Sequence, residues 1–104
     1  MSDRTTSEHR GDLELAKAVL AGDAAAFHKL FDLYGPPVMG FAQRVRAGSG
    51  PARVLAAEIL EAVFVHLDGY SGRTPLAAWV LAVARLVARG QAARAAEPRA
   101  ARSA

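Results

Sequence analysis

Three histidines and one pair of glutamates are the residues of this chain best suited to catalysis or metal binding. His9, His28 and His66 are scattered, and none lies three or four residues from another histidine. Histidine pairs that bind a metal from one helix usually have that spacing, so the pattern favours surface or partly packed histidines and predicts no metal site. Glu58 and Glu61 lie three residues apart and could support acid–base chemistry. The sequence pattern supplies no third residue to complete an acid–base site, so a solvated face is the simpler interpretation and a protein-contact face the second.

The sequence also lacks the motifs that usually mark an enzyme. It has no glycine-rich phosphate loop, no nucleophile elbow and no metal-binding motif, and it has no cysteine. The missing cysteines exclude disulfides and thiolate metal sites and are compatible with a reducing cytosol. We therefore predict that the protein is not an enzyme and uses no cofactor and no metal ion. The polar N-terminus and the short uncharged stretches predict neither a secretory signal nor a membrane span, so we expect a cytoplasmic protein.

The basic residues of the chain are concentrated near its C-terminus. Residues 69–104 hold six arginines and one glutamate, whereas residues 1–68 hold nine acidic and seven basic residues. Four of the arginines and the single tryptophan lie on or beside one predicted helix, and they are Arg73, Arg85, Arg89, Arg94 and Trp79. Arginines can follow phosphates and tryptophan can stack on an unpaired base, so these residues are candidates for nucleic-acid binding. The alternatives are a solvated helix face with a basic tail, and packing of the tryptophan in the core.

Helices are the elements expected to position these side chains, because the chain is rich in alanine and has few β-branched residues other than valine. Asp12 could cap a first short helix that ends at Gly22, and Asp23 could cap a second helix directly afterwards. The second helix carries an apolar stripe with Phe27, Leu30, Phe31 and Tyr34, which continues beyond the prolines to Val45. A kink or a short break is expected where Gly35-Pro36-Pro37 interrupts it, since proline lacks the N–H and clashes with the preceding turn.

Two further helices are predicted in the second half of the chain. The third is expected from about Ala52 to Asp68, after a glycine-rich loop. Thr74 could be the N-cap of the fourth helix and Pro75 its first residue. We expect this helix to fray from Glu97, because a proline follows.

The apolar positions of these two helices repeat at the spacing of one helix face. The third helix carries Leu55, Ile59, Leu60, Val63, Phe64 and Leu67 on one broad face, and the fourth is expected to bury Leu76, Trp79, Val80, Val83, Leu86 and Val87. The sequence therefore predicts an all-α fold, a compact bundle of about four helices over residues 12–96. Residues 1–11 are predicted to form a flexible leader and residues 97–104 a flexible tail.

Two blocks of the sequence resemble a known family. The stretch DLELAKAVLAGDAAAFHKLFDLYGPPVM fits the pattern "AGD…AF..L…Y.P.V", and HLDGYSGRTPLAAWVLAVAR is similar to "hLd.f….s.raWL..IAR". Both patterns are typical of the conserved second region of bacterial RNA polymerase sigma factors of the extracytoplasmic-function type. The resemblance needs no gap from Asp12 to Arg94 and covers 83 of the 104 residues. It implies the helical fold of the sigma second-region domain.

The resemblance also implies a function, which is to bind RNA polymerase core and the minus-ten promoter element in transcription initiation. One helix would dock on the clamp coiled coil of the largest polymerase subunit, through Leu55, Glu58 and Glu61. The last helix and the loop before it would capture the opened minus-ten strand with flipped bases. The residues that would hold the DNA backbone are Arg73, Arg85, Arg89 and Arg94, while Trp79 would be mainly structural. An anti-sigma factor is a further class of partner that the resemblance implies.

Several contact positions differ from the residues usual in that family. The docking helix usually contains "DL.QEVF", and the same register here is VLAAEIL, so Val54 and Ala57 replace two polar residues. Leu86 stands where the family usually has asparagine, and Ala92 and Ala93 lie where an aspartate and arginines are common. These apolar changes support a second hypothesis, a degenerate sigma-like adaptor that acts by protein–protein contact without recognising promoters. Its partner would be an anti-sigma factor, another sigma-type protein, polymerase or a second copy of the chain.

Two other questions stay open in the sequence. The family normally carries another helical domain that binds the minus-thirty-five element, and the chain has no room for one. The sequence is compatible with a domain of a longer protein and with a stand-alone protein. A third hypothesis is an unrelated helical bundle, since helices rich in Ala, Leu, Val and Arg resemble one another.

Overall fold

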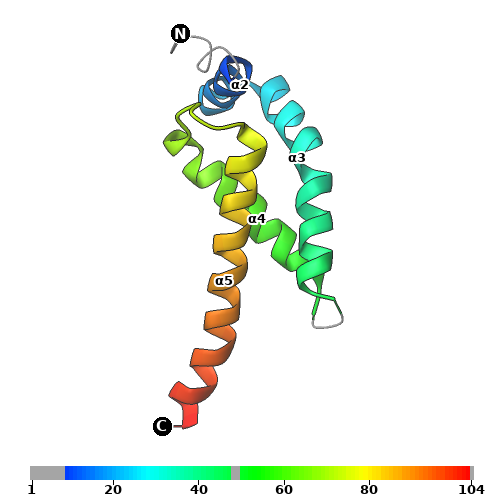
Figure 1. Cartoon of the computed structure of the whole chain (residues 1–104), viewed down its shortest axis with the longest axis vertical. Coiled ribbons are helices and arrows are strands. Elements are labelled where there is room, and N and C mark those ends of the chain that lie inside the picture. Colours follow the sequence, from blue (N-terminus) through cyan, green and yellow to red (C-terminus); the bar gives the residue numbers. More distant parts are fainter. Residues whose placement is uncertain (1–8, 48–49, 104) are drawn as a thin grey trace.

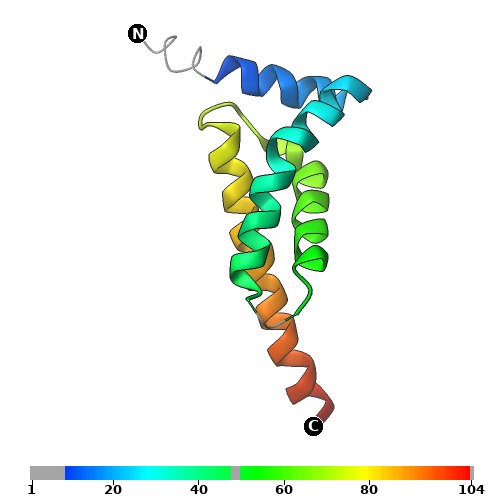
Figure 2. The ribbon, with the colours of Figure 1, turned by 90° about the vertical axis from the view of Figure 1, so that its right-hand side faces the viewer.

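The fold is a bundle of helices, seen here in a computed structural model that describes residues 9–47 and 50–103, with side chains described up to residue 92. Its elements are α2 (Arg10–Leu20), α3 (Ala24–Val45), α4 (Ala52–His66), the 3-10 helix η1 (Leu67–Gly69) and α5 (Leu76–Ser103). None of the described residues is in a strand. α3, α4 and α5 pack together, and α2 crosses one end of them (Figures 1 and 2). The predicted all-α bundle of about four helices is therefore confirmed.

The connection between α2 and α3 forms as the sequence predicts. Gly22 has a left-handed φ of 90°, which favours glycine, and the Asp23 amide donates back to the Ala18 carbonyl at 3.0 Å. Asp23 then caps α3, because its carboxylate accepts from the amides of Ala25 at 2.9 Å and Ala26 at 3.2 Å. The end of α2 and the start of α3 thus depend only on neighbouring residues, which explains why the residue types alone were sufficient to predict them.

The structure shows no break at the two prolines of the second predicted helix. α3 is continuous through Pro36 and Pro37, so the predicted alternative of a short break is wrong. The helix axis does change direction about halfway along α3 (Figures 1 and 2). Both prolines are exposed, whereas Val38 and Ala42 beyond them are buried. Packing of that second half against α4 stabilises the helix despite the lost backbone hydrogen bonds.

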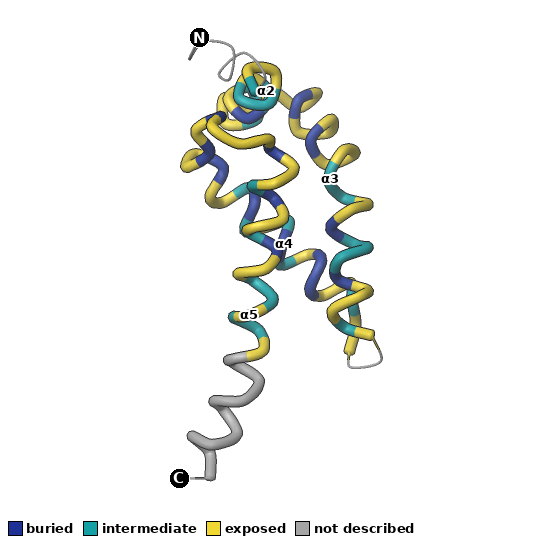
Figure 3. Tube along the Cα trace, viewed as in Figure 1, coloured by how far each residue is buried: buried dark blue, intermediate teal, exposed yellow. Residues whose placement is uncertain are grey.

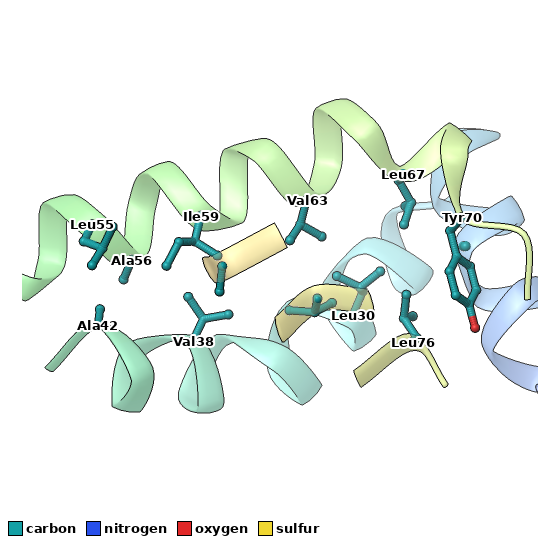
Figure 4. Close-up of a cluster of buried hydrophobic side chains, with 13 residues drawn as sticks. Leu30, Val38, Ala42, Leu55, Ala56, Ile59, Val63, Leu67, Tyr70 and Leu76 are labelled. Atoms are coloured by element: carbon teal, nitrogen blue, oxygen red, sulfur yellow. The ribbon is translucent and has the colours of Figure 1, made fainter. Parts of the chain in front are cut away.

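The hydrophobic core lies between α3, α4 and α5. In Figure 4, Val38 of α3 faces Ile59 of α4, and Ala42 faces Leu55 one turn away. The largest fully buried side chains are Leu30, Leu55, Ile59, Leu67, Leu76 and Val63. These positions follow the predicted apolar stripes, and buried residues recur along α3, α4 and the first half of α5 (Figure 3).

Some residues predicted to be buried lie nearer the surface. Leu60, Phe64, Trp79, Val83 and Val87 are half-buried. The prediction for Leu86 was wrong, because its side chain is 64% exposed. The buried residue in that part of α5 is instead Ala84, which is 1% exposed and lies one turn after the buried Val80.

The last helix is longer than predicted. α5 continues through Gly90 and Pro98 to Ser103, so the predicted stop at the proline was wrong for the backbone. The φ of proline suits a helix, and the neighbouring alanines favour one. The Arg46 guanidinium donates to the Gln91 side chain and links α5 to the end of α3. Beyond that link α5 projects from the bundle (Figure 1), and the molecule measures 56 × 27 × 24 Å.

Both remaining helix starts differ from the prediction. α2 begins at Arg10, inside the predicted leader, and the rest of the leader up to residue 8 lies outside the described residues. Asp12 does not cap α2 but accepts a hydrogen bond from the Leu76 amide at 2.9 Å, at the start of α5. α5 begins at Leu76, directly after Pro75, rather than with that proline as its first residue.

Candidate functional site

One side of α5 carries two of the predicted arginines. Four residues lie on one side of this helix, because they follow one another at spacings of four, three and four positions. They are Ala78, Ala82, Arg85 and Arg89. All four are exposed. We call this set the arginine stripe, and it extends over about 16 Å at 1.5 Å per residue. The small alanines leave room for a partner backbone, and the arginines supply positive charge for phosphates.

The other two predicted arginines lie before and after the arginine stripe in the sequence. Arg73 is exposed in the loop of residues 70–75, directly before α5. Arg94 lies in the α5 backbone, but its side chain is outside the described residues. The structure thus places three of the four predicted arginines at the surface, and each of these three is available to a polyanion.

A second side of α5 forms a groove with α4. The groove has a volume of about 860 Å³. We call it the α4–α5 groove, and its lining comprises Glu58, Glu61, Ala62, Val65, His66, Asp68, Gly69, Trp79, Val83, Leu86, Val87 and Gly90. Val65 and Leu86 are each 64% exposed, so its walls present apolar surface to solvent. Three carboxylates lie among these apolar residues, and this combination suits a protein segment better than a nucleic acid.

Trp79 belongs to this groove rather than to the arginine stripe. Its ring is half-buried and packs edge-to-face against Tyr70, with 5.8 Å between the ring centroids. The carboxylates that line the same groove would repel the phosphates of a strand whose base stacked on this ring. The position of Trp79 therefore favours the packing interpretation over the stacking one.

The structure corrects one of the three predicted docking residues of α4. Leu55 is fully buried and faces α3 (Figure 4), so it is a core residue and offers no contact to a partner. Glu58 is half-buried and Glu61 is exposed, and both line the α4–α5 groove. Val54 and Ala57, where the family usually has polar residues, are both exposed. The exposed surface of α4 therefore combines apolar residues with the carboxylates that line the groove.

An aromatic patch lies on α3 and α4. Phe27 stacks on Phe64 with 4.6 Å between ring centroids and on Phe31 with 6.5 Å. Phe27 is 41% exposed and Phe31 is 45% exposed, although both lie on the predicted apolar stripe of the second helix. The stripe was predicted correctly, but α4 covers only part of it.

The loop of residues 70–75 is held by contacts that the sequence did not predict. The Tyr70 hydroxyl donates to the Thr74 carbonyl at 2.6 Å, and Asp12 of α2 accepts from the Leu76 amide. Burial raises the pKa of Tyr70 and of Tyr34, and the nearby Asp12 carboxylate raises both further. No local signal marks Asp12 for this contact, because its partner lies 64 residues away.

The three histidines do not converge on a site. Among the described residues, no group of three or more His, Asp or Glu side chains could hold a metal ion. His28 contacts the Phe27 ring edge-to-face at 5.9 Å, and His66 lines the α4–α5 groove. No helix in the described part of the chain is long and apolar enough to span a bilayer.

Comparisons of the chain with protein-family models, curated protein sequences and solved structures found no match. The resemblance to sigma factors therefore stays a prediction from the sequence pattern.

Proposed function

We propose that the chain is a sigma-type transcription initiation domain, which binds RNA polymerase core in the cytoplasm and captures the minus-ten strand of an opened promoter. It performs no catalysis of its own. The loop of residues 70–75 and the arginine stripe contact DNA. The outer surface of α4, with Glu58 and Glu61, docks on the clamp coiled coil of the largest polymerase subunit.

The observation that supports this proposal most directly is the arginine stripe. Arg85 and Arg89 are exposed on a side of α5 that neither the core nor the α4–α5 groove uses. The exposed Arg73 lies in the loop before the same helix, so basic side chains flank the uncharged first half of α5, residues 76–84. We expect these arginines to give salt-dependent affinity for phosphates and the loop to contact an unstacked base.

The test is to replace the two stripe arginines singly by alanine and to measure binding of labelled minus-ten single strands over a salt series. We expect Arg85→Ala and Arg89→Ala each to weaken binding and to lower the slope of log affinity against log salt by about 0.7–1 per lost phosphate contact. Arg53→Ala is the matched control, because it removes an exposed arginine from α4. Equal slopes for the wild type and the two stripe variants would contradict the assignment of Arg85 and Arg89 to DNA.

A second candidate function is favoured by the α4–α5 groove. The exposed Leu86 and Val65 lie in it, and Leu86 replaces a residue that is usually polar in the family. An apolar surface with carboxylates fits a protein partner, so the chain would act as a sigma-like adaptor that does not recognise promoters. Its partner would be an anti-sigma factor, another sigma-type protein, polymerase or a second copy.

A charge placed in the groove tests the adaptor function. In that function, Leu86→Glu abolishes binding to the partner, which we would test by sedimentation with a second copy of the chain. Core polymerase does not separate the two functions, because its proposed docking residues Glu58 and Glu61 line the same groove, so strand binding by the wild type decides between them. Leu33→Glu is the control, since Leu33 is 49% exposed on α3. Promoter-strand binding by the wild type with sequence preference would contradict the adaptor function.

A further inference from the structure

The N-terminal helix contacts the loop of residues 70–75 and the start of α5. The half-buried Asp12 lies in the first turn of α2, and its Oδ2 accepts a hydrogen bond from the Leu76 amide at 2.9 Å. That amide is one of the first in α5, where backbone donors have no partner within the helix. Asp12 therefore acts as a helix cap supplied by a different helix, and its negative charge also suits the positive end of the α5 dipole.

A second contact brings the same helix against the middle of the loop. Gly72 is buried and has a φ of 80°, a conformation that side chains other than glycine rarely adopt. A Cβ at this position would lie 3.2 Å from Leu13 Cδ2 and 3.3 Å from Leu13 Cβ. The loop backbone thus packs closely on Leu13, the residue next to Asp12. Two consecutive residues of α2 contact two points of the loop region.

Tyr70 closes the loop on itself. Its hydroxyl donates to the Thr74 carbonyl at 2.6 Å, and its ring packs against Trp79 in the first turn of α5. The electrostatic effect of Asp12 on the pKa of Tyr70 and of Tyr34 is consistent with these three groups lying near one another. The loop is therefore held at its start, middle and end, and the arginine Arg73 that it carries remains exposed.

We propose that Asp12 is a positioning residue, which holds the loop of residues 70–75 and the first turn of α5 in the conformation that captures a nucleic-acid strand. The proposal rests on the sigma-type function proposed above. Asp12 itself carries a negative charge and does not contact the strand. It acts through the Leu76 amide, which fixes where α5 begins and therefore where Arg73 and the arginine stripe lie relative to each other.

The sign of the expected effect distinguishes this role from simple electrostatics. If Asp12 affected a strand only through its charge, its removal would strengthen binding to the polyanion. If Asp12 positions the loop, removal of the carboxylate weakens binding. Part of the binding free energy is then used to order the loop, which the wild type already holds in place. Asp12→Asn separates the two effects, since asparagine loses the charge but keeps an oxygen that can cap a helix.

The experiment compares the wild type with Asp12→Ala, Asp12→Asn and the control Glu14→Ala, which removes an exposed carboxylate from the same helix. The first readout is the hydrogen-exchange rate of the Leu76 amide, which is measured by NMR under conditions where all variants are folded. We expect about fivefold faster exchange in Asp12→Ala, the factor that matches a typical helix cap. Asp12→Asn and Glu14→Ala should exchange at the wild-type rate. Unchanged protection of Leu76 in Asp12→Ala would overturn the proposal.

The second readout is the affinity for the minus-ten single strand. We expect Asp12→Ala to bind about fivefold more weakly, and Asp12→Asn and Glu14→Ala to bind as tightly as the wild type or more tightly. Equal or tighter binding by Asp12→Ala, despite faster Leu76 exchange, would also overturn the positioning role. If the wild type binds no strand, the proposed function fails and the positioning role for strand capture fails with it, while the exchange readout still decides whether Asp12 caps α5.

Discussion

Asp12 and Asp23 are two aspartates near helix ends, and each caps a helix in a different way. Asp23 accepts from amides two and three residues ahead, which is the local pattern that residue type and position predict. Asp12 accepts from an amide 64 residues ahead, and the sequence assigned it to the wrong helix. At the scale of single residues, local caps are predictable from sequence, whereas a cap supplied by another element depends on the packing of the whole bundle.

The two tyrosines provide a prediction about pH at this scale. The pKa of Tyr34 and that of Tyr70 are raised, first by burial and then by the Asp12 carboxylate. The folded protein therefore holds both phenol protons more tightly than the unfolded chain does. The resulting stabilisation is fully present below pH of about 10, the ordinary pKa of tyrosine, and is lost as pH rises through the raised folded pKa values.

The measurement is the near-ultraviolet absorbance of tyrosinate against pH, for the folded protein and for the protein in denaturant. We expect a higher midpoint in the folded protein, and a Tyr34→Phe variant isolates the titration of Tyr70. Identical midpoints in the two states would show that the two phenols are not shielded in this way.

The elements of the fold were largely predictable because their signals are local. The limits of α4 and the start of α3 follow from caps, turn residues and apolar spacing, and the structure agrees within two residues. The bend in α3 without a break was not predictable, because it depends on packing of Val38 and Ala42 beyond the prolines. The apolar spacing of α5 also overstated burial, because the bundle covers only part of its apolar surface and leaves Leu86 exposed in the α4–α5 groove.

The contact between α2 and the loop of residues 70–75 supports a prediction at the scale of elements. We expect Gly72→Ala to lower the free energy of unfolding by about 1–2 kcal/mol from the left-handed backbone alone. The new Cβ also approaches Leu13, which increases the loss. Urea denaturation measures the effect, with Gly69→Ala as the control, because no atom lies within 4 Å of a Cβ at Gly69 and its φ is not positive. A loss no larger than that of the control would contradict the close packing of the loop on α2.

At the scale of the whole molecule, α5 separates two surfaces of different chemistry. Its arginine stripe is exposed and basic, and the α4–α5 groove on another side is apolar and lined by carboxylates. The concentration of arginine near the C-terminus predicted the first surface. The groove was not predicted, because it depends on how far α4 and α5 lie apart. In the proposed function, one helix would therefore contact a polyanion and a protein at the same time.

The central claim is that these surfaces serve promoter capture together with RNA polymerase. Fluorescence anisotropy of labelled minus-ten and scrambled single strands, with and without core polymerase, tests this claim most directly over a salt series. We predict binding that is tighter for the minus-ten strand, that becomes tighter still when core polymerase is present and that weakens as salt rises. Equal affinity for both strands in the presence of polymerase, or no binding at low salt, would contradict the claim.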